Sequence, residues 1–214
     1  MKVELISAMG DDLTVVNAAR VSFAKHSTDF TEKDSKLIQY LAKHNHFTPF
    51  THCVITLRET VPLFVARQRF KHTVGFSYNE VSRRYIQDNP AFYYPEYWRK
   101  KAENTKQGSS QETVEDSNGV ASAYSKMMQN ALATYNLLLL KGVCPEQARM
   151  ALPQSMYTSY YVTGSLMAFA RAYNLRSDSN AQKEIRDLAE EWNKLCIDLY
   201  PVSWRALTSN NLGE

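Results

Sequence analysis

The sequence predicts an α+β fold in one domain of residues 1–214, rich in helix and with a small antiparallel or mixed sheet. Its 214 residues fall within the size range of a single domain, and 44% apolar with 22% charged residues is ordinary globular composition. Apolar residues recur at helical spacing over most of the chain, whereas strand-like alternation appears only early. A chain of this length can bury a core without disulfides or metal.

The first third of the chain holds the strand-like segments. Residues 2–8 alternate as a short strand, and Asp12 is expected to cap the helix that follows. A second helix is predicted over 32–43. Residues 53–60, CVITLRET, alternate as a half-buried strand does. Pro62 is expected to open a helix over 62–72, because its missing N–H costs little at that position.

The rest of the chain is predicted to be helical, apart from one polar exposed loop over 104–118. Four further helices are expected, at about 119–141, 144–152 and 164–175, with a last long one carrying an apolar stripe from Ile185 to Leu199. No apolar run approaches the roughly 20 residues that cross a bilayer. The N-terminus does not resemble a signal peptide, so a cytoplasmic protein without a membrane partner is predicted.

Cysteines and histidines give no metal-binding pattern. The three cysteines are Cys53, Cys144 and Cys196, and no two of them form a CxxC pair. This pattern argues against a disulfide framework and against a structural zinc site. Three histidines, His44, His46 and His52, have no carboxylate or cysteine at ligand spacing. We therefore expect no metal. The net charge of +3 is too small to argue for nucleic acid.

Residues 67–85, RQRFKHTVGFSYNEVSRRY, hold the densest set of ligand-binding groups. The first half should be helical, with Arg67 and Lys71 on one face, before a turn near Gly75. The second half combines hydroxyl, amide, carboxylate and guanidinium groups: Ser77, Asn79, Glu80, Ser82, Arg83 and Arg84. Such groups suit a phosphorylated ligand, because arginine offers phosphate paired donors. A charged surface turn explains them equally well. The same two alternatives, a phosphate-binding group or a charged group on the surface, are open for Arg149 and Arg176.

The segment resembles the signature of the flavin-dependent thymidylate synthases. That signature is Arg-His-Arg, seven or eight residues, then Ser, with Asn-Glu before the Ser and Arg-Tyr soon after it. Here KHT is followed by eight residues and then SRRY. Five other segments resemble the family's landmarks in the same order: AARVSF (18–23), HFTPFTH (46–52), VARQ (65–68), ARMALP (148–153) and LRSDSNAQKEIR (175–186).

The resemblance implies an α+β enzyme, a methyltransferase that makes dTMP from dUMP. It implies methylenetetrahydrofolate as carbon donor, NADPH as reductant, bound FAD, and a homotetramer whose active sites are shared between subunits. The positions that match dUMP contacts are Gln68, Lys71, Glu80, Ser82, Arg83, Arg84, Arg149 and Arg176. The positions that match FAD contacts are Ser22, His46, Thr48, Lys71, His72, Thr73, Glu80, Ser165, Arg171, Leu175 and Asn180. Arg176 matches the arginine that favours loss of the uracil N3 proton, and it is the expected catalytic residue.

Departures from the family pattern cluster in the flavin positions. Lys71 and Thr73 replace arginines, Thr51 a glutamate and Asn180 a histidine, while Ser165 and Met167 stand for an Asn and an Arg. Lysine keeps the charge but loses the planar fork, and threonine loses both. The hypothesis that follows is weaker or rearranged FAD binding.

Two rivals remain: a nucleotide- or RNA-binding module built on residues 67–85, and a family member that binds dUMP without turnover. Cys144 before Pro145 superficially resembles the nucleophile of the flavin-free thymidylate synthases. The rest of that pattern is absent, so a structural role is expected for Cys144.

Overall fold

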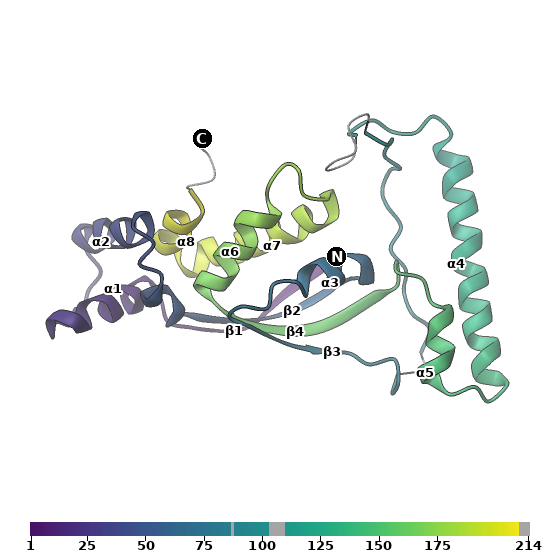
Figure 1. Ribbon diagram of the computed structural model, residues 1–214, viewed down its shortest axis with the longest axis horizontal. Coiled ribbons are helices and arrows are strands. Elements are labelled where there is room, and N and C mark those ends of the chain that lie inside the picture. Colours follow the sequence, from purple (N-terminus) through teal and green to yellow (C-terminus); the bar gives the residue numbers. More distant parts are fainter. Residues whose placement is uncertain (87, 103–109, 210–214) are drawn as a thin grey trace.

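The computed structural model describes residues 1–86, 88–102 and 110–209, and it confirms the α+β prediction (Figure 1). The sheet is antiparallel throughout, in the order β1–β2–β4–β3. Its strands are β1 (Lys2–Met9), β2 (Val54–Pro62), β3 (Phe76–Glu80) and β4 (Tyr157–Ser165).

Helices cover one face of the sheet and both of its ends. Figure 1 shows α6 and α7 above the sheet, α1, α2 and α8 gathered at one end, and the long α4 standing beyond the other end with α5. Their bounds are α1 (Asp12–Arg20), α2 (Glu32–Lys43), α3 (Leu63–Arg69), α4 (Ser117–Leu140), α5 (Pro145–Ala148), α6 (Leu166–Arg176), α7 (Lys183–Leu199) and α8 (Pro201–Thr208). None of the described helices is long and apolar enough to cross a membrane.

The core lies between the sheet and these helices. Along β2 and β4, side chains alternate between fully buried, as at Leu57 and Val162, and exposed, as at Arg58 and Tyr161. Trp192 of α7 packs edge-on against Phe169 of α6, and both are fully buried. The alternation predicted for 53–60 is thereby confirmed, and the strand runs on to Pro62.

Strand β4 has no counterpart among the predicted elements, although it lies inside the sheet between β2 and β3. The helix expected from about 164 begins instead at Leu166, where the Ser165 hydroxyl accepts from the Ala168 N–H at 3.2 Å. Gly164 belongs to the strand. A Cβ there would lie 2.4 Å from the Phe76 ring, so the close packing of β3 on β4 requires glycine at this position.

The helix predicted over 62–72 is shorter than expected. Pro62 ends β2 and caps α3, which stops at Arg69. The Phe70 N–H still bonds four residues back, to Ala66, but those of Lys71 and His72 bond three residues back, to Gln68 and Arg69. Gly75, at φ +78°, then reverses the chain into β3. The prediction that Arg67 and Lys71 share a helix face is therefore wrong, because pairing of β3 with β4 overrides the helical pattern.

The expected cap of α1 is also corrected by one residue. Asp11 is the N-cap, and its Oδ1 accepts from the Thr14 N–H at 2.7 Å. Asp12 is buried and instead accepts from the first N–H groups of α8, those of Val202 at 2.9 Å and Ser203 at 2.8 Å. A carboxylate at a helix N-terminus is favourable, so Asp12 ties α1 to α8.

The polar loop predicted over 104–118 is only partly visible. Residues 104–109 lie outside the described part of the chain. Residues 110–116 are irregular except for a single bridge between Arg99 and Thr113, and α4 begins at Ser117. The short helix predicted over 144–152 is α5, followed by a 3₁₀ turn over Arg149–Ala151.

Candidate functional site

A cavity of about 870 Å³ opens where β3 ends and the chain runs into residues 81–91. Four of the predicted ligand residues line it: Glu80, Ser82, Arg83 and Arg149. Arg149 reaches it from the 3₁₀ turn after α5, and the others from β3 and the segment that follows β3. Residues far apart in the sequence therefore meet at one surface hollow.

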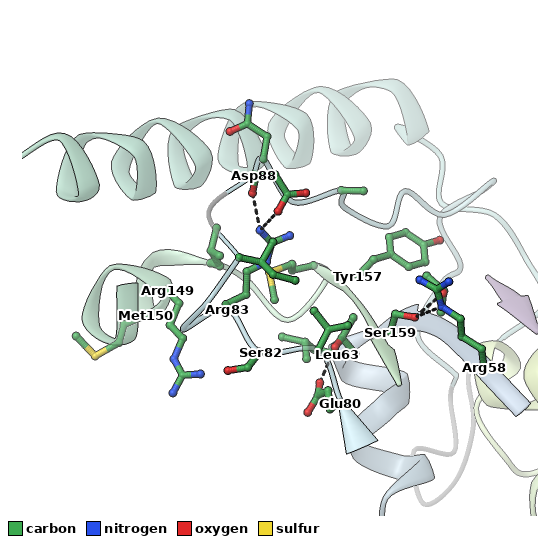
Figure 2. A pocket seen from close by; sticks show the side chains of 18 residues that line it. Arg58, Leu63, Glu80, Ser82, Arg83, Asp88, Arg149, Met150, Tyr157 and Ser159 are labelled. Carbon is green, nitrogen blue, oxygen red and sulfur yellow. Dashed lines mark hydrogen bonds and ion pairs between the residues drawn. The ribbon is translucent and has the colours of Figure 1, made fainter. Parts of the chain in front are cut away.

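Ser82 and Arg149 are the groups best placed for an anion. Figure 2 shows the Ser82 hydroxyl and the Arg149 guanidinium directed to the same side of the cavity. Arg149 is exposed, and among the described residues only its Nε has a partner, the Glu146 carbonyl at 3.3 Å, which is a weak bond. Its terminal nitrogens are thus available for the paired bonds that guanidinium forms with phosphate.

The two arginines that follow Ser82 are already engaged. Arg83 turns its guanidinium toward Asp88, bonding its carbonyl at 2.5 Å and its Oδ1 at 3.3 Å (Figure 2). Arg84 does not line the cavity; its Nε pairs with Glu146 Oε1 at 2.5 Å on the surface. An exposed pair of this kind is weak, so an incoming anion can compete for Arg84.

Glu80 closes the side of the cavity next to the sheet. Its Oε1 accepts a 2.6 Å hydrogen bond from the Thr158 hydroxyl of β4, which fixes the direction of the carboxylate. A carboxylate accepts only, so Glu80 can receive a hydroxyl or N–H of a ligand but would repel its phosphate. The cavity therefore has two different ends. Ser82 and Arg149 can bind an anion at one end, and Glu80 can accept hydrogen bonds from a ligand at the other.

A second group of predicted residues lies apart from this cavity, at the junction of α3, α6 and the start of α7. Arg176 at the end of α6 donates from Nε to His72 Nε2 at 2.8 Å and from Nη2 to the Gln68 carbonyl at 3.4 Å. The Gln68 side chain bonds that of Gln182 at 2.5 Å. We call Gln68, His72 and Arg176 the arginine–histidine cluster. None of the three lines the cavity.

His72 in this cluster is held neutral. Burial, together with the positive charges of three nearby guanidinium groups, lowers the pKa of His72 from 6.5 to about 4; the groups are those of Arg176, Arg69 and Arg171. A neutral imidazole has one acceptor nitrogen, and here that nitrogen faces Arg176. Burial likewise lowers the pKa of Arg176, which nevertheless stays charged at neutral pH.

The residues matched to flavin contacts are spread over four segments. Ser22 is exposed after α1, and His46 and Thr48 flank the turn before β2. Lys71, His72, Thr73 and Glu80 lie in the turn after α3 and on the strand β3 that follows, and the rest are on or next to α6. A cavity of about 340 Å³ lies between the His46–Thr48 turn and α6, and of the matched residues only Arg171 lines it. Asn180 is exposed, and its N–H bonds Asp178.

The same segments expose apolar side chains beside their polar ones. Side chains of this kind are 54–75% exposed: Val21, Phe23, Phe47, Val74 and Leu175. Exposed apolar groups that flank hydroxyls, a histidine and two cations suit a large planar cofactor with polar edges, or a second copy of the chain. The residues present thus fit a flavin, which would contact Ser22, Thr48, His72 and Arg171.

The cysteines show no sign of a nucleophile. Burial raises the pKa of Cys53 and of Cys196 to about 12. Cys144 is exposed at the start of the four-residue α5. Within the described residues, no three histidine, cysteine or carboxylate side chains converge as metal ligands.

Several residues near these sites went unpredicted. Arg58 and Ser159 line the far end of the large cavity, bonded to each other at 3.2 Å. Glu59 and Arg69 are fully buried beneath the cluster. One signal for Glu59 was present, because its position in the alternating strand puts a carboxylate among inward-facing residues.

Together the fold, the cavity and the arginine–histidine cluster define an α+β protein that binds an anionic ligand. The protein supplies the hydroxyl, carboxylate and guanidinium groups of the site. The family model described as thymidylate synthase complementing protein, Thy1, matches residues 4–202. A flavin-dependent thymidylate synthase from Thermosipho africanus is 41% identical over 186 residues, which span 86% of this chain and 81% of that protein. One from Thermus thermophilus is 37% identical over 210 residues, 98% of this chain and 76% of that one.

Among solved structures, a UMP/dUMP methylase from Streptomyces cacaoi bound with 5-Br dUMP superposes with a TM-score of 0.88 at 30% identity. The match covers 97% of this chain and 94% of that one. The chain therefore belongs to the Thy1 family, whose relatives carry the name flavin-dependent thymidylate synthase, and the predicted resemblance is confirmed.

Proposed function

We propose that this chain is a flavin-dependent thymidylate synthase, converting dUMP to dTMP with methylenetetrahydrofolate as carbon donor and NADPH as reductant. The observation that carries the proposal is the pairing of an anion-accepting cavity at Ser82 and Arg149 with the arginine–histidine cluster, in a member of this family. The whole chain serves as one catalytic domain in the cytoplasm.

In this proposal the cavity binds the nucleotide phosphate. The free guanidinium of Arg149 and the Ser82 hydroxyl supply donors, and Arg84 joins them by leaving Glu146. Arg83 supports the segment through Asp88 instead of reaching the phosphate. Glu80, fixed by Thr158, accepts from the sugar or base.

Arg176 acts on the base. With Nε and Nη2 held by His72 and Gln68, its Nη1 is left to meet a ligand. A fixed cation beside uracil N3 would stabilise the anion that forms when the N3 proton leaves, and that anion makes C5 more nucleophilic. FAD, when bound, supplies the hydride chemistry. This chain's residues supply orientation and charge.

We further propose a homotetramer with shared sites. The cavity and the cluster lie apart in one chain. Four of the eight positions matched to dUMP contacts line the cavity, and two others, Gln68 and Arg176, are in the cluster. The exposed apolar side chains around the flavin positions support burial against another copy. In such an assembly one subunit's Ser82 and Arg149 face another subunit's Arg176.

One assay tests the proposal and both rivals: NADPH oxidation and dTMP formation with FAD, dUMP and methylenetetrahydrofolate present. We expect both to depend on dUMP. A dUMP-binding protein without turnover would bind the nucleotide and form no dTMP. An RNA-binding module would retain RNA in a salt-sensitive way and show no flavin absorbance. Either result would overturn the proposal.

The same preparation tests flavin affinity. Thr73 stands where the family has an arginine and Asn180 where it has a histidine, so this chain lacks two donors at the flavin positions. We therefore expect the purified protein to lose FAD during dialysis and to regain activity when FAD is added back. A stoichiometric yellow cofactor retained through dialysis would overturn this expectation. The measurement is the ratio of flavin to protein absorbance before and after dialysis.

A further inference from the structure

A fully buried ion pair lies directly behind the arginine–histidine cluster. Arg69 Nε of α3 approaches the two carboxylate oxygens of Glu59 of β2 at 3.2 and 3.4 Å, and both side chains are 0% exposed. The guanidinium carbon lies 4.3 Å from the Phe76 ring centre and 4.5 Å from that of Trp192. Aromatic faces thus enclose the cation where water is excluded.

The carboxylate of this pair is saturated with donors. Glu59 also accepts from the Tyr160 hydroxyl at 2.6 Å and from Trp192 Nε1 at 2.9 Å. These donors come from β4 and α7. Together with Arg69 of α3, they hold the Glu59 carboxylate from three elements. A buried ion pair seldom adds net stability over an apolar core of the same shape, which leaves its presence behind the cluster to be explained.

The pair reaches the cluster through one hydroxyl. Arg69 Nη1 donates to Tyr78 Oη at 2.7 Å, and that hydroxyl donates to the His72 carbonyl at 2.8 Å. The backbone of residue 72 is thereby anchored in the turn between α3 and β3. The imidazole of the same residue accepts from Arg176 Nε at 2.8 Å.

We propose that Glu59, Arg69 and Tyr78 are positioning residues that hold His72 so that its imidazole fixes the orientation of Arg176. The inference rests on the proposed function, in which Arg176 meets the uracil. The positive charge of Arg69 also opposes protonation of His72, which would turn the Nε2 acceptor into a second donor facing a guanidinium. The His72 imidazole thus orients Arg176 through a hydrogen bond, and the charge of Arg69 keeps that imidazole neutral, so that Arg176 Nη1 faces the ligand.

The test removes one hydroxyl. Tyr78→Phe keeps the ring packing and deletes the link to His72. Tyr200→Phe is the control, because Tyr200, which is fully buried whereas Tyr78 is partly buried, also donates to a main-chain carbonyl, that of Met9 at 3.1 Å, away from the cluster. Tyr78→Phe removes the bond accepted from Arg69 as well as the bond donated to His72, whereas Tyr200→Phe removes one bond. Tyr78→Phe should therefore lose more stability, with each loss on the order of a few degrees in Tm.

For Tyr78→Phe we expect kcat to fall about tenfold while the KM for dUMP changes less than about threefold, as for a lost alignment of the reacting groups. Tyr200→Phe should keep the parent kcat. Equal kcat values in the two variants, each assayed well below its own Tm, would overturn the proposal, since loss of the link to His72 would then have no effect on turnover.

Nitrogen NMR of His72 supplies a readout that needs no turnover. In the parent we expect the Nδ1–H tautomer, with Nε2 as acceptor, to persist until the pH falls toward 4. In Tyr78→Phe the burial and the guanidinium charges that lower the pKa of His72 persist, so the expected change is the loss of a single tautomer, with both neutral tautomers present at neutral pH. A parent His72 that carries its proton on Nε2 overturns the proposal, even if Tyr78→Phe does not fold. If the parent makes no dTMP but shows this tautomer, and Tyr78→Phe shows the mixture of tautomers, the proposed function fails and the positioning of His72 stands.

Discussion

The cavity around Ser82 and the arginine–histidine cluster contrast in how firmly they hold their cations. Arg149 is exposed on a short 3₁₀ turn, with one 3.3 Å contact to a carbonyl. Arg176 is half-buried at the end of a helix, with two of its nitrogens bonded and a buried ion pair behind its partner His72. A loosely held cation suits capture of a charged phosphate, whereas a fixed one suits stabilisation of charge that develops at one atom.

The contrast predicts the largest loss at Arg176. Arg176→Ala should lower kcat by at least about 100-fold, because a fixed charge beside the reacting base acts in the transition state. dTMP formation at saturating dUMP is the measurement. Arg205→Ala, which removes an exposed arginine of α8 that the resemblance assigns to neither dUMP nor FAD, shows whether any loss of positive charge has this effect. Near-normal kcat in Arg176→Ala would break the comparison.

The cavity predicts a loss of affinity in place of a loss of rate. Arg149→Ala should raise the KM for dUMP about 10- to 100-fold with kcat within a few-fold of the parent, since a charge-assisted bond to phosphate persists through the reaction. Steady-state kinetics over a range of dUMP concentrations measures both constants. If kcat falls and KM does not, the phosphate assignment is contradicted.

Arg84 sharpens the comparison because its engagement is intermediate. Arg84→Ala should raise the KM for dUMP by less than Arg149→Ala, about three- to tenfold, because Arg84 must first leave Glu146. Glu146→Gln frees Arg84 and should leave the KM unchanged or lower it. A higher KM in Glu146→Gln would show that the surface pair holds Arg84 in its working position.

The smallest effect concerns pH and stability. The pKa of His72 is about 4 in the folded protein and 6.5 when unperturbed, so the unfolded chain binds the proton more tightly. Stability from neutral His72 is complete above pH 6.5 and is lost as the pH falls through 6.5 toward 4, by roughly 1–3 kcal/mol. His72→Gln should flatten that part of the stability profile in urea unfolding. An unchanged dependence of stability on pH in His72→Gln would show that another group titrates in this range.

How much the sequence predicts differs between the two regions. Ser82, Glu80 and Arg149 came together as the family resemblance implied, and the helix over 32–43 was predicted at its observed bounds. Without the resemblance, the residue types allowed only a choice between a phosphate site and a charged turn. Arg83 and Arg84 illustrate the reason, because their partners Asp88 and Glu146 decide which guanidinium stays free.

The network behind the cluster could not be predicted, because it is made across the sequence. Glu59 meets Tyr160 from β4 and Trp192 from α7, 101 and 133 residues away. Strand β4, which brings Tyr160 there, was itself missed, since its nine residues run directly into α6 without a break that periodicity could detect. The inward position of Glu59 in an alternating strand was the one local sign.

Mixing two inactive variants tests the central claim, that the two regions serve one dUMP site built from different copies. Arg149→Ala and Arg176→Ala protein, assayed at low dUMP, should each form little dTMP alone. After the subunits are mixed and exchanged, about a quarter of the sites would combine an intact Arg149 with an intact Arg176, if subunits assemble at random. We therefore expect dTMP formation to return to about a quarter of the parent rate. A mixture as inactive as its components would contradict a site divided between subunits.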